Sequence, residues 1–114
     1  MKECVINVEE RDGVYILHLD GSLDAYSFPN LEAQLKNLKE KDHNKVVLDC
    51  SGLDYIHSAA LGAFIGFARM SRERKGDLKL VNLSPKIYNI VELLGFHKIL
   101  EIHKDLDQAV AKFS

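Results

Sequence analysis

The chain has 114 residues, 46% of them hydrophobic and 28% charged, which is typical of one soluble globular domain with a core of its own. Its formal net charge of −2 argues against nucleic acid as the main partner, because phosphate binding requires clustered Lys and Arg. No segment is apolar over the length of a membrane span, and the N-terminal segment lacks the apolar centre of a secretory signal. We therefore expect a cytoplasmic protein without direct membrane insertion.

Metal and cofactor sites are not expected from the cysteines and histidines. Cys4 and Cys50 are too few and too far apart for a zinc or redox motif. The five histidines form no HxxxH pattern and no local cluster with carboxylates, so the sequence predicts no metal, no cofactor and no His–carboxylate cluster.

The chain opens with a predicted β-hairpin. The segments Cys4–Glu9 and Val14–Asp20 are strand-like, and the Asp12-Gly13 step between them favours a tight turn. The second segment is apolar on both faces, which is typical of a central strand. We expect His18 within it to be a hydrogen-bonded histidine of the core.

A helix is predicted next. Residues 21–26 are expected to end the second strand, and Ser27 and Pro29 mark a helix start. Apolar residues then recur at helical spacing as far as about Lys41, at Leu31, Leu35 and Leu38.

The central segment, residues 45–72, is predicted to be a strand, a loop and a second helix. Lys45–Asp49 is a short β-branched run typical of a buried strand. Residues 50–54 are expected to form a loop of turn residues that includes Gly52, followed by a two-residue apolar step, Tyr55-Ile56, and by His57. Ser58 is expected to be the N-cap of a helix that continues to Arg72.

The remaining elements alternate between strand and helix. Asp77–Val81 and Leu100–Ile102 are predicted strands. Ser84-Pro85 begins a third helix that stops at Gly95, with a predicted buried stripe of Ile87, Ile90, Val91 and Leu94. Asp105 is expected to cap a last helix, Leu106–Phe113. This order predicts a single α/β domain over residues 1–114, with a mostly parallel four- to five-stranded sheet and about four helices.

The second helix has an unusual outer face. Ser58, Gly62, Gly66 and Arg69 share one narrow stripe, while its large apolar residues lie opposite. Glycine inside a helix costs about 1 kcal/mol relative to alanine, so a close approach by another surface would explain both glycines. That surface is either a partner, the interpretation we favour, or a neighbouring element of this domain. Ile65 borders the stripe and is a candidate apolar anchor for a partner.

Three segments resemble the STAS family, which includes bacterial anti-sigma factor antagonists. They are the turn Gly21–Asp24, the strand Val46–Asp49, and residues 54–62, DYIHSAALG. In the antagonists the last segment usually reads Asp-Ser-(Ser/Ala)-Gly-Leu-Gly, and a partner kinase that is also the anti-sigma factor phosphorylates its first serine. Ser58 occupies that position here. His57 stands in place of the acid, and Ala60 in place of the first glycine.

The resemblance implies a STAS domain that acts as an anti-sigma factor antagonist, as a monomer or weak dimer. Unphosphorylated, it would bind a serine-kinase anti-sigma factor and so release a sigma factor, and phosphorylation of Ser58 would end the binding. The resemblance also implies that Asp24 is exposed near Ser58. We further expect His57 to pair with a phosphate that an acid would repel.

Three alternatives remain open. Ser58 is a plain helix cap without a function, or the chain is a STAS interaction subunit that is never phosphorylated, for example in a lipid-transport ATPase complex. The third is a small hydrolase using Ser58 with His57 as its base. We place it last and expect no enzyme activity, because adjacent residues seldom point at each other in a nucleophile–base pair.

Overall fold

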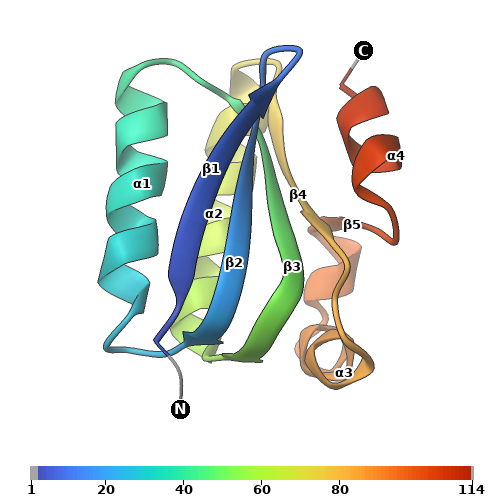
Figure 1. The fold of residues 1–114 in the computed structure, drawn as a ribbon. Coiled ribbons are helices and arrows are strands. Elements are labelled where there is room, and N and C mark those ends of the chain that lie inside the picture. The colour runs from blue at the N-terminus through green and yellow to red at the C-terminus, as the bar shows by residue number, and fades with distance from the viewer. Residues whose placement is uncertain (1–2, 114) are drawn as a thin grey trace.

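The computed structural model describes residues 3–113, which form one mixed sheet flanked by helices (Figure 1). Strand order in the sheet is β1-β2-β3-β4-β5. The strands are β1 (Val5–Arg11), β2 (Val14–Leu23), β3 (Lys45–Ile56), β4 (Asp77–Val81) and β5 (Glu101–His103). The helices are α1 (Phe28–Glu40), α2 (Ser58–Glu73), α3 (Pro85–Leu93) and α4 (Leu106–Ala111), with a short 3₁₀ turn at Phe96–Lys98. The predicted fold class is confirmed.

The N-terminal hairpin forms as predicted. β1 pairs antiparallel with β2, and the turn residues Asp12 and Gly13 have φ of 54° and 81°. Both values are positive, as a two-residue turn between twisted strands requires. The pairs β2–β3, β3–β4 and β4–β5 are parallel, so the carboxyl ends of these four strands face one edge of the sheet.

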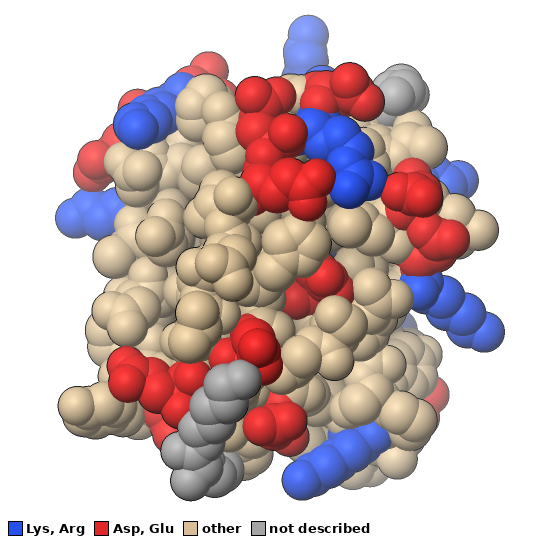
Figure 2. All heavy atoms as spheres, in the orientation of Figure 1, with Lys and Arg blue, Asp and Glu red and all other residues tan. Residues whose placement is uncertain are grey.

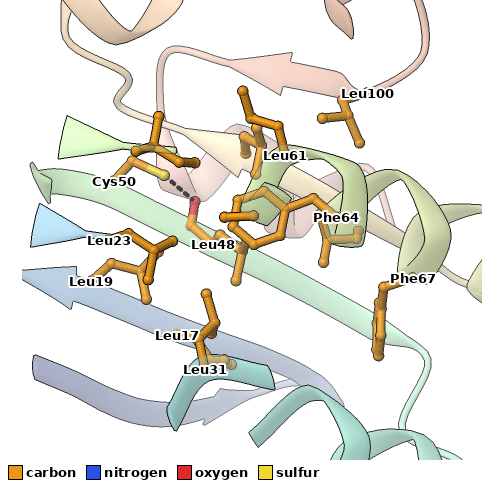
Figure 3. Packing of buried hydrophobic residues seen from close by; sticks show 14 of the residues in the cluster. Leu17, Leu19, Leu23, Leu31, Leu48, Cys50, Leu61, Phe64, Phe67 and Leu100 are labelled. Carbon is orange, nitrogen blue, oxygen red and sulfur yellow. Dashed lines mark hydrogen bonds between the residues drawn. The ribbon is translucent and has the colours of Figure 1, made fainter. Parts of the chain in front are cut away.

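The main core lies between the sheet and helices α1, α2 and α3 (Figure 3). The predicted leucine stripe of α1 is buried, and α2 contributes Phe64, whose side chain is fully buried. The close-up shows Phe64 and Leu61 of α2 facing Leu48 of β3 across this layer. By analogy with other buried phenylalanines, truncation of Phe64 to alanine would cost about 3–5 kcal/mol of stability. The main core therefore fixes where α2 begins and which face it exposes.

The opposite face of the sheet is only partly covered. Helix α4 packs Ala109 and Val110 against a second, smaller cluster that includes Ile16 and Val47 of the central strands. The thiols of Cys4 and Cys50 are buried and free, and burial raises the pKa of both.

Strands β2 and β3 are longer than predicted, and this is the largest correction to the expected fold. β2 continues to Leu23 and β3 to Ile56, where the prediction placed a break and a loop. The added segments pair with each other, with Leu23 opposite Ile56. Gly52 allows this pairing, because a Cβ there would lie 3.1 Å from the carbonyl oxygen of Leu19. Gly52 therefore permits a close approach of two strands, and the prediction that it is a turn residue is wrong.

Smaller corrections concern the C-terminal third. Ile87 and Val91 are buried as predicted, but Leu94 is 45% exposed because it follows the last turn of α3 and does not belong to its inner stripe. Gly95 ends that helix with a φ of 76°, as predicted. β5 begins one residue later than expected, at Glu101, and α4 ends at Ala111.

Candidate functional site

The candidate site lies at the edge of the sheet where β2 and β3 end and α1 and α2 begin (Figure 1). The amide of His57 donates a hydrogen bond to the carbonyl oxygen of Leu23, at 3.0 Å, which joins the ends of the two strands. The His57 ring also contacts the ring of Phe28, the first residue of α1, with centroids 5.5 Å apart in an edge-on arrangement. These contacts bring the Asp24 turn and the start of α2 together.

The N-cap of α2 is His57, which corrects the prediction that Ser58 has this role. His57 has an extended backbone, and its Nδ1 accepts a hydrogen bond from the amide of Ala60 at 3.3 Å. Ser58 is the first helical residue and is exposed. Within residues 3–113 we find no hydrogen bond that involves its hydroxyl. The serine is therefore available to a partner without loss of the cap.

The first turn of α2 favours an added negative charge at Ser58. The first turn of α2 contains no acidic residue. The amides at a helix N-terminus carry a partial positive charge and bind anions such as phosphate. An acidic residue at position 57 would oppose such a charge, whereas His57 does not.

Asp24 organises the turn that faces this helix start. Its Oδ1 accepts hydrogen bonds from the amides of Tyr26 and Ser27, both at 3.0 Å. The hydrogen bond from the Ser27 amide is the main reason that the pKa of Asp24 is lowered, so the carboxylate is charged at neutral pH. Asp24 is half-buried, and the expectation of an exposed side chain is met only in part. Next to it, Tyr26 is 83% exposed, a feature that sequence reasoning missed.

The outer stripe of α2 is open as the helical periodicity predicts. Gly62, Gly66 and Arg69 are exposed. A Cβ added at either glycine would have no neighbour within 4 Å, so no described element of this domain packs against them. Ile65, the candidate apolar anchor, is only 8% exposed and packs in the core of this domain.

A His–carboxylate cluster exists on the partly covered face of the sheet, contrary to the prediction. His18 bonds to Asp49 through Nδ1 at 2.7 Å and to Glu9 through Nε2 at 2.9 Å. His18 is half-buried, so it is satisfied as expected but does not lie in the core. The Asn82 amide donates to Asp49 at 3.1 Å. Local spacing could not reveal a cluster whose members come from three strands.

The pKa values of this cluster shift in opposite directions. Burial lowers the pKa of His18, but its hydrogen bonds to Glu9 and Asp49 outweigh burial and raise it. Burial raises the pKa of Asp49, while its hydrogen bonds with Asn82 and His18 lower it further than burial raises it. The hydrogen bond from His18 lowers the pKa of Glu9. The charged forms of all three are therefore favoured. No group of residues in the described part of the chain could hold a metal ion.

The charge on one face of the molecule gives no sign of a nucleic-acid interface. On the face seen in Figure 2, Lys and Arg side chains are scattered among acidic ones and do not gather into a basic patch. None of the helices within residues 3–113 has the length and apolar character required to cross a membrane.

The hydrolase alternative gains no support from this geometry. Nδ1 of His57 is occupied by the Ala60 amide, and no hydrogen bond joins the His57 ring to the Ser58 hydroxyl in the described structure. A serine nucleophile needs such a contact with its base.

Comparison with known proteins was made by sequence and by structure. BtrV of Bordetella bronchiseptica, a candidate anti-sigma factor antagonist, is 32% identical over 108 residues, 95% of this chain and 93% of BtrV. The anti-sigma-B factor antagonist of Listeria monocytogenes is 31% identical over 98 residues, 85% of this chain and 86% of that protein.

Among solved structures, the anti-sigma factor antagonist SpoIIAA in its unphosphorylated form superposes with a TM-score of 0.75 at 15% identity, covering 95% of this chain and 96% of its own. The phosphorylated form of the Bacillus cell fate determinant SpoIIAA superposes with a TM-score of 0.73 at 16% identity, covering 96% and 100%. At such identities the likeness shows the fold. The family model of the STAS domain matches residues 5–109, and with these relatives it establishes that the chain belongs to the STAS domain family.

Proposed function

We propose that this chain is an anti-sigma factor antagonist controlled by phosphorylation of Ser58. In its unphosphorylated form it binds a serine-kinase anti-sigma factor and thereby releases a sigma factor. Phosphorylation of Ser58 by that kinase ends the binding. The names of the relatives support the class of protein, and the phosphorylated form of SpoIIAA is a precedent for the modification within the same fold.

The observation that carries this proposal is the division of roles between His57 and Ser58. His57 satisfies the Ala60 amide, so the Ser58 hydroxyl is not needed to hold the helix. A phosphate at Ser58 would add about −1.5 to −2 charges and three acceptor oxygens. The free amides and the dipole of the first turn accept that charge, so the fold survives while the surface changes.

The proposed partner surface extends from the Asp24 turn along the outer stripe of α2. The ring of His57 lies at the start of α2, and the Leu23–His57 hydrogen bond joins this start to the turn that holds the charged carboxylate of Asp24. Gly62 and Gly66 leave two successive turns of the stripe without side chains, and Arg69 lies at its far end. Such a surface allows the partner's backbone to approach closely, and a phosphate at its Ser58 end would alter both its charge and its shape.

The experiment combines phosphate uptake with binding. The chain is incubated with ATP and a candidate serine-kinase anti-sigma factor, intact mass gives the number of phosphates, and peptide mapping gives their position. Ser58→Ala should abolish uptake and keep binding, while Ser58→Asp should weaken binding. Ser51 is an exposed serine of β3 outside the proposed surface, so Ser51→Ala and Ser51→Asp are matched controls that should behave as wild type.

Two outcomes would contradict the proposal. Phosphate uptake by Ser58→Ala at the wild-type level would place the modification elsewhere. Stable binding to a partner with no uptake from any candidate kinase would favour the STAS interaction subunit that is never phosphorylated.

A further inference from the structure

A cavity lies at the same edge of the sheet as Ser58 but is built from other elements. Its volume is about 790 Å³, within the range of small-molecule sites in proteins. The residues that line it come from the segment after β4, from α3 and the 3₁₀ turn, and from β5 and the segment after it. Neither α2 nor the Asp24 turn contributes to it, so the cavity is distinct from the surface around Ser58.

The lining combines apolar surface with hydrogen-bond donors and lacks acids. Leu83, Pro85 and Ile102 supply the apolar part. The polar part consists of an amide, a phenol, two imidazoles and an ammonium group, from Asn82, Tyr88, His97, His103 and Lys104. None of the eight lining residues carries a carboxylate.

The nearest acid of β5 is already neutralised by other groups. Glu101 accepts from Lys79 Nζ at 2.9 Å and bonds to His103 Nε2 at 2.7 Å. Lys104 is exposed and forms no ion pair with any residue of the described range. Its positive charge is therefore available to a ligand.

One polar atom of the lining lacks a partner. Nδ1 of His97 is buried and has no hydrogen bond within the described structure. Buried polar atoms without a partner are rare, and each one costs free energy. No contact among the described residues places this nitrogen at the surface of the cavity, so the polar contacts of a ligand come from the other polar groups of the lining.

The walls of the cavity are held by hydrogen bonds. The Asn82 amide group donates to Asp49, and the Asn82 backbone N–H donates to the His103 carbonyl at 3.3 Å. Ser84 caps α3 by accepting from the amide of Ile87 at 3.2 Å. The cavity is therefore largely formed in advance, at the carboxyl ends of parallel strands where α/β proteins commonly bind ligands.

We propose that this cavity binds a small amphiphilic organic anion. The acid group of the ligand pairs with the Lys104 ammonium and accepts hydrogen bonds from the polar lining. The apolar body packs against Leu83, Pro85 and Ile102. Neither the phosphorylation of Ser58 nor the partner surface enters this inference.

The test is an NMR titration of the whole chain with decanoate, an amphiphilic anion used as the probe. Saturable amide shifts are expected at Leu83, Ile102 and Lys104. Decyltrimethylammonium has the same chain with a positive head group and should not produce them, and acetate alone should bind far more weakly. Lys104→Glu should weaken decanoate binding about tenfold or more, because an ionic hydrogen bond is replaced by repulsion.

Lys112→Glu is the matched control, since Lys112 is also an exposed lysine but follows the end of α4, outside the cavity. It should leave the affinity unchanged. The inference is overturned if decanoate produces no saturable shifts, if the cationic probe produces the same shifts, or if Lys104→Glu binds as well as Lys112→Glu. Wild-type amide spectra of both variants outside the cavity would show that neither is unfolded.

Discussion

Nδ1 of His57 accepts the amide hydrogen of Ala60 at 3.3 Å, and Ser58 is the residue that follows this capping histidine. The cap and the serine are thus separate groups on neighbouring residues. On a serine that capped the helix itself, the added phosphate would have to take over that bond. Here a phosphate can be added while the helix start remains satisfied.

The cap gives a first prediction for stability. His57→Ala should lower the free energy of unfolding by about 1 kcal/mol, within the range of 0.5–2 kcal/mol found for lost N-caps. His57→Asp should keep or raise it, since aspartate caps well and its charge suits a helix N-terminus. Urea unfolding measures both. Equal stability of His57→Ala and wild type would show that the bond contributes nothing.

Phosphorylation should reverse the order of stability of wild type and His57→Asp. In the phosphorylated state an aspartate at position 57 lies beside the phosphate and repels it. His57 can pair with the phosphate in its charged form, and we expect this pairing to exceed the loss of the Ala60 bond, which needs an unprotonated Nδ1. We therefore expect phosphorylated His57→Asp to melt below phosphorylated wild type at pH 6, with a smaller difference at pH 8. Thermal unfolding of the four protein forms at both pH values provides the comparison. If phosphorylated His57→Asp is no less stable at pH 6, the pairing does not exist.

A side chain added on the outer stripe of α2 should stabilise the fold and weaken binding to the partner. Gly62→Ala fills open space in a helix interior, so it should stabilise the fold by about 0.5–1 kcal/mol, or about 4 °C in melting temperature. The added methyl group should weaken the complex with the anti-sigma factor. Gly95→Ala is the control for a glycine that the backbone requires. It should lower the stability, because a φ of 76° makes alanine destabilising there. Unchanged partner affinity of Gly62→Ala would remove this position from the interface.

The His18 cluster predicts a dependence of stability on pH. The raised pKa of His18 means that its contribution is complete below the pKa of about 6.5 in the unfolded chain. It is lost as the pH rises through the higher folded value. The lowered pKa values of Glu9 and Asp49 act at the acid side, where stability is lost as the pH falls through them.

Urea unfolding at several pH values between about 5.5 and 9 tests the His18 contribution. His18→Gln should remove the part of the decline that begins near pH 6.5. His43→Gln is a suitable control, because His43 stacks on Tyr15 and has no carboxylate partner in the described structure. An identical pH profile for wild type and His18→Gln would show that the cluster does not favour the charged imidazole.

Sequence patterns predicted the elements whose signals are local. The Asp12-Gly13 turn, the leucine spacing of α1 and the stop at Gly95 each depend on a few neighbouring residues, and all three are confirmed. The extension of β3 through Gly52 could not be predicted in this way. Polar and glycine residues normally end strands, and only the pairing with β2 overrides that tendency.

The same distinction applies to the site. Helical periodicity correctly predicted that Ser58, Gly62, Gly66 and Arg69 are exposed on one stripe. Serine is a common N-cap, so propensity placed the cap one residue too late, and only the position of the His57 ring corrects it. The cluster around His18 depends on the register of three strands, which no local spacing encodes.

Ser58 is the proposed regulated group, and peptide mapping of the phosphorylated chain is the decisive experiment. After incubation with ATP and a kinase that binds the chain, we expect one phosphate, located on the peptide that contains Ser58 and absent from Ser58→Ala. The same sample should bind the kinase more weakly than unphosphorylated protein, while Ser51→Ala remains indistinguishable from wild type. A phosphate found only on another residue, or full binding by the protein phosphorylated at Ser58, would show that Ser58 does not control the binding.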